Sequence, residues 1–281
     1  MLKRVYRLLH PKFQKVVLDY PVDARPRYGH GRPAHPGLLD VVEAQRGRYE
    51  TLIDAALTHR DALQGIRDAA ATTDPHAPAW NNGFLPGLDV VAIYTMLATY
   101  APARYVEIGS GNSTKVARKA IRERGLLTRV TSIDPAPRAE IDDLADEVIR
   151  QPFETLDRDL AAELEPGDVL FVDNSHRLLP NSDATVFFLE VLPRLRPGVI
   201  VHVHDVYLPY DYPQFMCDRF YSEQYGLAMF LLAAPEKYRV LWPGYFISED
   251  ATLSERIEPM WAHPNLAGVE RHGGSFWFEI A

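Results

Sequence analysis

Cysteine is almost absent from this sequence, which has a single one, Cys217, in 281 residues. A lone cysteine forms no intramolecular disulfide and no cysteine-rich zinc site, which suits a reducing compartment, so we expect a cytoplasmic location. Long apolar runs are absent too: no stretch of 18 residues is continuously apolar, and no transmembrane helix is predicted. The basic segment 1–18 is interrupted by polar residues and no small-residue cleavage site follows it, so we do not expect a signal peptide.

The chain has fewer basic than acidic side chains. The 30 Lys and Arg residues are outnumbered by 38 Asp and Glu, which gives a formal net charge of −8. Binding to a phosphate backbone depends on clustered cationic side chains, so this composition argues against a DNA or RNA partner. A hydrophobic content of 47% with 24% charged residues is typical of a globular protein with a full core. We therefore expect a small-molecule partner.

The residue pattern divides the chain into two regions. Prolines and glycines over 20–36 indicate an irregular connection, and apolar residues recur at helical spacing over 38–70 and again over 88–100. After residue 102, short apolar runs alternate with helical patterns. We predict an N-terminal helical extension and loop over 1–80 and a Rossmann-like domain over 81–281.

The short apolar runs are rich in Val and Ile, as are strands that are buried on both faces of a sheet. The predicted strands are 105–108, 130–133, 147–149, 169–172, 199–203, 238–241 and 276–280, and the predicted helices among them are 113–123, 183–194 and 214–232. Alternation of strand and helix implies right-handed crossovers. The predicted fold class is therefore α/β, with a seven-stranded, mostly parallel sheet, helices on both faces and a ligand site at the carboxyl ends of the strands.

A glycine-rich turn, Tyr105-Val-Glu-Ile-Gly-Ser-Gly-Asn-Ser-Thr-Lys115, joins the first predicted strand to a helix. Gly109 and Gly111 permit a tight turn and close approach of a ligand to the backbone, while Ser113 can cap the helix. A dinucleotide fingerprint would have a third glycine where Thr114 stands, so a nicotinamide cofactor is disfavoured.

Two acidic residues lie near this turn. Glu107 stands two positions before the first glycine and suits a cationic or amino-bearing ligand, whereas Asp134 ends the next strand and suits the two hydroxyls of a ribose. The alternative for both is that the carboxylate caps a strand or stabilises a turn. The Glu-x-Gly-x-Gly pattern resembles the first motif of class I S-adenosylmethionine-dependent methyltransferases. The resemblance implies S-adenosylmethionine as cofactor, with Glu107, Gly109, Ser110, Gly111, Ser113 and Asp134 as its binding residues.

Polar residues also end two later strands, in Val172-Asp-Asn-Ser-His176 and Val201-His-Val-His-Asp205. Because the carboxyl ends of adjacent parallel strands converge, we expect these side chains to surround one cavity. His176 is the first choice for the general base that removes the acceptor's proton, since the pKa of histidine lies near neutrality. His204 is either structural or catalytic, and Asp205 is a candidate orienting carboxylate.

The resemblance extends over about 80–212, to a bacterial Methyltransferase 24-like family in which strands ending Phe-Ile-Asp-Gly-x-His and His-Asp are typical. The matching stretches are Phe171–His176 and His204–Asp205, with Asn174 where glycine is more usual. Asp173 and Asn174 are accordingly expected at the cofactor. In related metal-assisted O-methyltransferases, carboxylates at such strand ends hold a divalent cation, which implies Asp173 and Asp205 as possible ligands of Mg2+ or a similar hard ion.

Other parts of the chain are candidates for the remaining contacts. Gln151, Phe153 and Glu154 follow the third strand, where the resemblance implies a contact with adenine. The alternative is that a helix simply begins at Phe153. The aromatic loops 80–84 and 207–213 either line an acceptor pocket or have only a packing role. His202 is expected to be a packed, hydrogen-bonded side chain. The apolar helix 214–232 is expected to be core or a homodimer face.

Three hypotheses from different classes follow. The leading one is a methyltransferase that uses S-adenosylmethionine to methylate a hydroxyl of a small molecule or sugar, with His176, His204 and Asp205 as catalytic residues. The alternatives are a metal-dependent enzyme that kept the fold without methyl transfer, and a non-catalytic cofactor-binding protein.

Overall fold

The N-terminal region is mainly helical. The computed structural model describes residue 10, residues 15–137 and residues 139–281, so the basic segment 1–18 lies mostly outside the described residues. The first described elements are α2 (Pro36–Glu43), α3 (Arg46–Thr58), α4 (Arg60–Gln64), a small parallel pair of strands β1 (Arg67–Asp68) and β2 (Ala79–Trp80), and α5 (Gly87–Tyr100). The helices predicted over 38–70 and 88–100 are thus confirmed, the former as three short helices.

Seven of the described strands form the main sheet. They are β3 (Arg104–Ile108), β4 (Arg129–Ile133), β5 (Glu147–Ile149), β6 (Val169–Val172), β7 (Ile200–Val203), β8 (Tyr238–Pro243) and β9 (Phe276–Ile280). Their order across the sheet is β5-β4-β3-β6-β7-β9-β8, and only β9 runs antiparallel to its neighbours. All seven predicted strands are present, with small differences at their ends, and the predicted mostly parallel sheet is confirmed.

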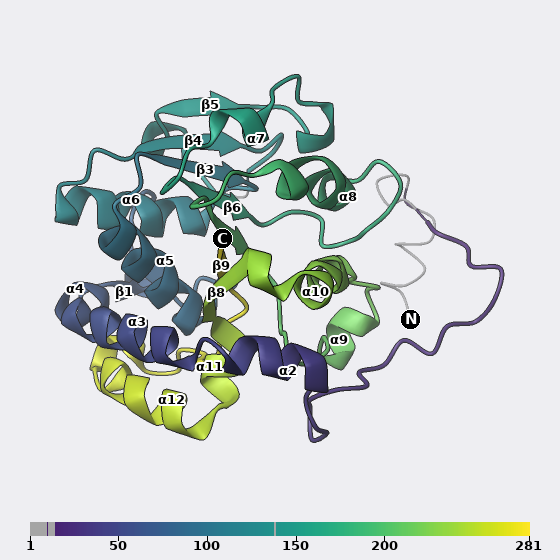
Figure 1. The fold of residues 1–281 in the computed structure, drawn as a ribbon. Coiled ribbons are helices and arrows are strands. Elements are labelled where there is room, and N and C mark those ends of the chain that lie inside the picture. Colours follow the sequence, from purple (N-terminus) through teal and green to yellow (C-terminus); the bar gives the residue numbers. More distant parts are fainter. Residues whose placement is uncertain (1–9, 11–14, 138) are drawn as a thin grey trace.

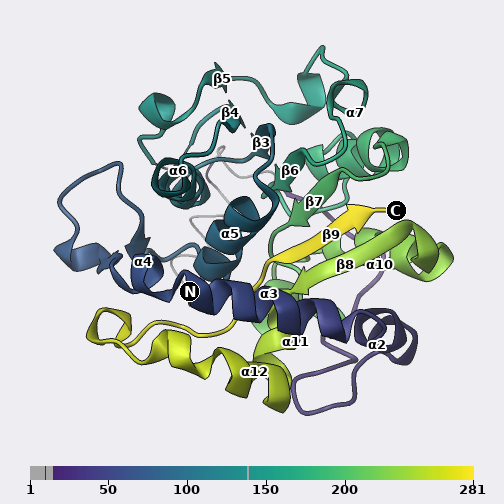
Figure 2. The same ribbon diagram turned by 60° about the vertical axis from the view of Figure 1, so that its left-hand side comes forward.

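Helices cover both faces of this sheet. The other described helices are α6 (Asn112–Arg124), α7 (Leu160–Glu163), α8 (Asp183–Val186), α9 (Gln214–Cys217), α10 (Glu223–Ala233), α11 (Gly244–Glu249) and α12 (Ala251–Ile257). α5 and α6 lie on one side of the sheet, whereas α7 and α10 lie on the other (Figures 1 and 2). The order of strands reverses between β3 and β6, and in doubly wound sheets ligands bind beside the carboxyl ends of the strands at such a reversal.

Two predicted helices are interrupted in the structure. The predicted helix 183–194 begins as α8 but continues as a π-helical turn over Phe187–Val191 and a 3-10 turn over Leu192–Arg194. The single helix predicted over 214–232 is wrong: it is split into α9 and α10, because the backbone N–H groups of Ser222 and Glu223 donate to the carbonyl of His176 instead of continuing a helix. The helices α11 and α12 had no sequence prediction.

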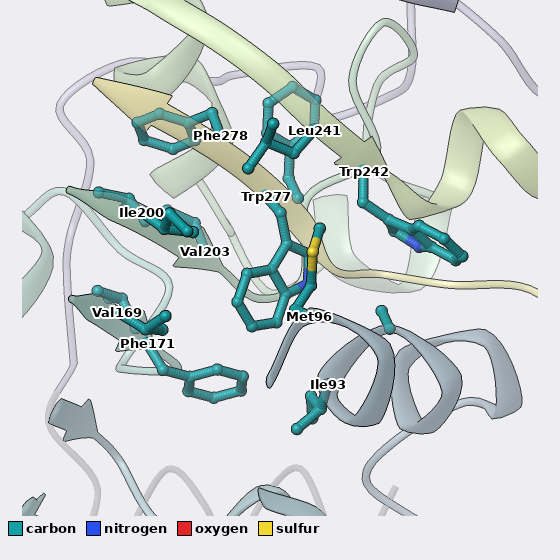
Figure 3. Close-up of a cluster of buried hydrophobic side chains, with 14 of the residues drawn as sticks. Ile93, Met96, Val169, Phe171, Ile200, Val203, Leu241, Trp242, Trp277 and Phe278 are labelled. Atoms are coloured by element: carbon teal, nitrogen blue, oxygen red, sulfur yellow. The ribbon is translucent and has the colours of Figure 1, made fainter. Parts of the chain in front are cut away.

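The core extends from the sheet to the N-terminal helices. Ile93 and Met96 of α5 lie against the face of the sheet that carries Phe171 and Trp277, as Figure 3 shows. Buried side chains of α3 belong to the same apolar cluster, so the region before residue 80 packs on the sheet. The boundary near residue 80 stays a prediction. Within the described residues, no helix is long and apolar enough to cross a bilayer.

Candidate cofactor cleft and acid–base cluster

Strand register explains why distant polar residues meet. Ile108 of β3 is aligned with Val172 of β6, and Val172 is in turn aligned with Val203 of β7. The residues that follow each strand, Gly109, Asp173 and His204, therefore leave the sheet at the same level. Adjacent parallel strands thus bring together residues that are almost 100 positions apart in the sequence.

The glycine turn passes directly against the end of β6. Gly109 has a φ of +78°, and a Cβ placed on it would lie 1.8 Å from the carbonyl oxygen of Asp173. No side chain fits there, so this position needs glycine for both space and conformation. The turn then enters α6, where the Gly111 N–H donates to Oγ1 of Thr114 at 3.1 Å.

A cleft opens above this turn. It is lined by Phe84, Leu85, Gly109, Ser110, Gly111, Asn112, Ser113, Asp134, Ala136, Ala139, Asp173, Asn174 and His176. Seven of the nine predicted cofactor residues therefore line this cleft, and so does the predicted general base, His176. Their role in binding stays a prediction.

Asp134 and Asn174 present their polar atoms at this cleft. Both carboxylate oxygens of Asp134 accept backbone N–H groups, from Ser110 at 2.9 Å and from Ala136 at 2.8 Å. The Oδ1 of Asn174 accepts the His176 N–H at 3.1 Å, while its Nδ2 is buried and has no hydrogen-bond partner among the described residues. A buried unsatisfied donor is costly, so this amide points to a ligand in the cleft.

Glu107 and Phe153 do not line the cleft. Glu107 is fully buried, with hydrogen bonds from Thr114 and Tyr105, and burial raises the pKa of Glu107 to about 8. The hydrogen bond from Thr114 joins β3 to the first turn of α6, and a role of Glu107 in cofactor binding stays a prediction. Phe153 is 7% exposed and belongs to the core.

His176 lies between acidic groups on both sides of its ring. Its Nδ1 is 3.1 Å from Oε2 of Glu223, and its Nε2 is 3.5 Å from Oδ1 of Asp173 and 3.4 Å from Oδ2 of Asp205. Burial alone would lower the pKa of His176, but Glu223, Asp205 and Asp173 outweigh it and raise the pKa. The backbone of His176 is in the left-handed region, with a φ of +60°. Residues other than glycine rarely adopt this conformation, and those that do are frequent at functional sites.

His204 is buried behind this pair of carboxylates. Its Nδ1 is 3.6 Å from Asp173 and 3.7 Å from Asp205, while its Nε2 is 3.0 Å from Oδ2 of Asp89. Burial would lower the pKa of His204, but these three carboxylates raise it well above its usual value. Burial alone would raise the pKa of Asp173, yet the imidazoles of His204 and His176 hold it below its usual range. We call Asp89, Asp173, His176, His204, Asp205 and Glu223 the acid–base cluster.

The predicted Mg2+ ligands Asp173 and Asp205 do lie together. Among residues 15–137 and 139–281, however, no group of three or more His, Cys, Asp and Glu side chains has the arrangement of a metal site. Mg2+ favours octahedral coordination by oxygen, whereas both carboxylates here face the nitrogens of two imidazoles. The donor set does not fit an all-oxygen site, and no step proposed below depends on a metal.

The two aromatic loops differ in role. Phe84 lines the cleft and is 52% exposed, whereas Trp80 is buried in the core. Tyr207 and Tyr212 of the second loop pack in a small separate core with Met216, Cys217 and Tyr221. His202 packs as expected: its ring stacks on Phe171 at 3.7 Å and its Nε2 lies 2.9 Å from Oγ of Ser275.

Asp89 and Glu223 were missed at the sequence level. Both lie near the start of helices with mainly apolar patterns, α5 and α10, where acidic residues are ordinary helix initiators. A signal was nonetheless present, because Asp89 stands in the apolar run Leu88-Asp-Val-Val-Ala-Ile93 at a position that faces the core. A charge in such a run needs a buried partner.

Part of the chain is similar to a known sequence family. Residues 106–206 match the sequence family described as a methyltransferase domain. No curated protein is significantly similar in sequence to the chain. Similar solved structures include SAH-bound Podospora anserina methyltransferase PaMTH1 (14% identity, 81% of this chain and 88% of that chain, TM-score 0.42) and a putative methyltransferase from Thermobifida fusca YX (14%, 68% and 78%, 0.41). A third is the plantazolicin methyltransferase BpumL in complex with SAH (11%, 88% and 100%, 0.38).

The matched segment contains the glycine turn, Asp134 and both histidines of the acid–base cluster. Residues 106–206 thus match a methyltransferase-domain family, and this match confirms the resemblance to class I S-adenosylmethionine-dependent methyltransferases predicted from the sequence.

Proposed function

We propose that this protein transfers the methyl group of S-adenosylmethionine to a hydroxyl of a small molecule. The observation that carries the proposal is the cleft at the reversal of strand order, where a glycine turn, the Asp134 carboxylate and the His176 imidazole meet. When bound, the cofactor supplies an activated sulfonium, so the protein has to align the two reactants and remove the acceptor's proton.

The cleft residues fit this cofactor. The unpartnered Nδ2 of Asn174 can donate to it, and each oxygen of Asp134 keeps a lone pair for a ribose hydroxyl after accepting one backbone N–H. Backbone N–H groups at the start of α6, at Asn112 and Ser113, lie in the cleft wall and favour a carboxylate group there.

We assign the role of general base to His176. In its neutral form the Nδ1–H donates to Glu223, which leaves Nε2 to accept the proton of the acceptor hydroxyl. With the cofactor bound, Nε2 would take this proton from the acceptor hydroxyl as the hydroxyl is methylated. Asp173 and Asp205 stabilise the resulting imidazolium, and His204 acts as a positioning residue that holds these two carboxylates.

Binding of the cofactor tests the proposal first. We expect one molecule of S-adenosylmethionine or S-adenosylhomocysteine to bind per chain in isothermal titration calorimetry. Asp134→Ala should weaken the affinity about 10- to 100-fold, since a hydrogen bond to a charged group contributes about 1.5–3 kcal/mol and 1.4 kcal/mol is a tenfold change.

The control is Asp157→Ala, which removes an exposed carboxylate that has no hydrogen bond or ion pair among the described residues. Unchanged affinity in Asp134→Ala would remove the ribose assignment. Failure of the parent protein to bind either ligand would overturn the proposed function in favour of a metal-dependent enzyme on this fold.

The pH dependence of the reaction follows from the raised pKa of His176. A general base works when it is neutral, so the rate should rise with pH and level off above that pKa, which lies above the ordinary value of about 6.5. NMR titration of the His176 imidazole measures the same pKa without an acceptor. Glu223→Gln should lower it, and a pKa below 6.5 in the parent protein would contradict the assignment.

The Mg2+ hypothesis makes a separate prediction. If a cation at Asp173 and Asp205 is required, treatment with EDTA should abolish formation of S-adenosylhomocysteine, and Mg2+ or Mn2+ should restore it. An unchanged rate in EDTA would leave deprotonation to His176 alone. The calorimetric titration repeated with and without Mg2+ separates an effect on cofactor affinity from an effect on turnover.

A homodimer also remains a proposal. Tyr225, Met229 and Leu232 of α10 are exposed, whereas Leu227 and Leu231 on the same helix are buried in the core. Analytical ultracentrifugation of the protein and of Met229→Glu tests whether this helix face is covered by a second copy.

A further inference from the structure

We infer that the acceptor carries an anionic group, a carboxylate or a phosphate, which binds Arg177 and Arg219 beside the proposed base. This inference rests on the proposed function, because it names the chemical class of the acceptor. It starts from Tyr221, whose ring stacks on the His176 ring at 4.7 Å between centroids with an interplanar angle of 25°. The Arg219 guanidinium carbon is 4.5 Å from the Tyr221 centroid, and that of Arg177 is 5.1 Å from it.

Both guanidinium groups thus lie one aromatic ring away from His176. Chain connectivity supports this placement, since Arg177 follows His176 directly and Arg219 lies two residues before Tyr221. The Arg177 guanidinium is also held by the backbone: its Nε donates to the carbonyl of Arg219 at 3.0 Å and its Nη1 donates to the carbonyl of Ser175 at 3.1 Å. Arg177 is therefore fixed in place by hydrogen bonds, whereas the Arg219 guanidinium rests on the Tyr221 ring.

These arginines have no anionic partner in the described part of the chain. Neither forms an ion pair there, and the guanidinium of Arg219 donates no hydrogen bond. This is notable in a protein of net charge −8, because carboxylates are plentiful. Two like charges over one ring repel each other, and an anion that bridges them would relieve that repulsion.

Guanidinium groups recognise planar carboxylate and phosphate oxygens through pairs of parallel N–H donors. In the proposed arrangement the cofactor lies in the cleft beside Gly109 and Asp134, and neither arginine lines that cleft, so the cofactor does not supply this anion. An acceptor with a hydroxyl at Nε2 of His176 and an acidic group that reaches past the Tyr221 ring would contact both the base and the arginines. The positive charges of Arg177 and Arg219 would also offset the repulsion that Asp173 and Asp205 exert on a negatively charged acceptor.

NMR of the complex with S-adenosylhomocysteine tests this directly. The arginine Nε–H signals are followed while inorganic phosphate or acetate is added, with chloride at equal ionic strength as reference. We expect saturable shifts at Arg177 and Arg219, and a loss of affinity of at least about tenfold in Arg219→Gln, as the loss of a charge-assisted contact implies. The matched control is Arg122→Gln, which removes an exposed arginine at the far end of α6.

The two anions distinguish the two acceptor classes, since the preferred probe identifies a carboxylate or a phosphate acceptor. Shifts that do not exceed those in chloride, or that persist in Arg219→Gln, would overturn the inference. An acceptor screen in matched pairs, each hydroxy acid beside its methyl ester, gives an independent readout. We expect the acid to have the higher kcat/KM and Arg219→Gln to erase that preference; preference for the ester would overturn the inference too.

Failure of this inference is distinguishable from failure of the proposed function. The latter fails if S-adenosylhomocysteine does not bind, and the anion titration can be carried out on the protein alone. The affinity for S-adenosylhomocysteine should be the same in Arg219→Gln as in the parent, because this arginine does not line the cofactor cleft.

Discussion

Replacing His176 by asparagine is expected to slow methyl transfer by about 100- to 10,000-fold, the usual contribution of general acid–base catalysis. Asparagine is preferred to alanine here because the backbone at this position has a φ of +60°, and asparagine tolerates the left-handed conformation. Its amide cannot accept a proton near neutral pH. The measurement is the initial rate of S-adenosylhomocysteine formation with an acceptor taken from the screen.

The cofactor affinity separates a catalytic role from a binding role. His176 touches the cleft at its edge, so the Kd for S-adenosylhomocysteine should change much less than the rate does. His76→Ala, at a partly exposed loop histidine far along the chain from the cluster, should leave both quantities unchanged. A rate for His176→Asn within a few-fold of the parent would refute the assignment of the base.

Removing the Asp89 carboxylate is expected to lower the free energy of unfolding by about 3–5 kcal/mol, the usual cost of breaking a buried ion pair from one side. Asp89 is fully buried and accepts hydrogen bonds from His204 at 3.0 Å, from the Gly274 N–H at 2.9 Å and from the Ser275 N–H at 2.9 Å. Asp89→Ala leaves the Nε2–H of His204 and two backbone donors without a partner in the interior. Urea denaturation monitored by circular dichroism measures the change.

A double-mutant cycle isolates the ion pair from the backbone contacts. His204→Gln alone should also destabilise the protein, but the double variant with Asp89→Ala should cost less than the sum of the two single changes. The pKa of His204 is raised in the folded protein, so its contribution to stability is fully present below about pH 6.5 and is lost as the pH rises through the folded-state pKa. The difference between parent and Asp89→Ala should therefore be larger at pH 6 than at high pH. Equal stability of parent and Asp89→Ala at pH 6 would show that the pair contributes nothing.

The strands were predictable because their signal is local. Runs such as Val169–Val172 are apolar at every position, and only a strand with both faces covered buries such a short run completely. The glycine turn was equally predictable, since the positive φ of the backbone at Gly109 favours glycine at that position of the turn. Once strands alternate with helices, the parallel sheet and the site at the carboxyl ends follow from general rules of connection.

Contacts between distant segments were not predictable in the same way. The helical pattern of 214–232 is continuous, yet the carbonyl of His176 accepts the N–H groups of Ser222 and Glu223 and ends the pattern there. The same break turns the Glu223 carboxylate toward the His176 ring. No local pattern contains this information, because the competing hydrogen bond comes from a loop more than 40 residues away.

By itself, the sequence determined the α/β class, the seven strands, the glycine turn and the two strand ends that carry Asp173, His176, His204 and Asp205, since each depends on short-range periodicity and on residues with few backbone choices. Only the tertiary structure decided that Glu107 is buried under the turn, that Asp89 and Glu223 hold the two imidazoles, and that Arg177 and Arg219 share the Tyr221 ring. The physical reason is that a charge or a hydrogen bond acquires its role from its partner, and these partners meet only when helices and strands far apart in the chain pack together.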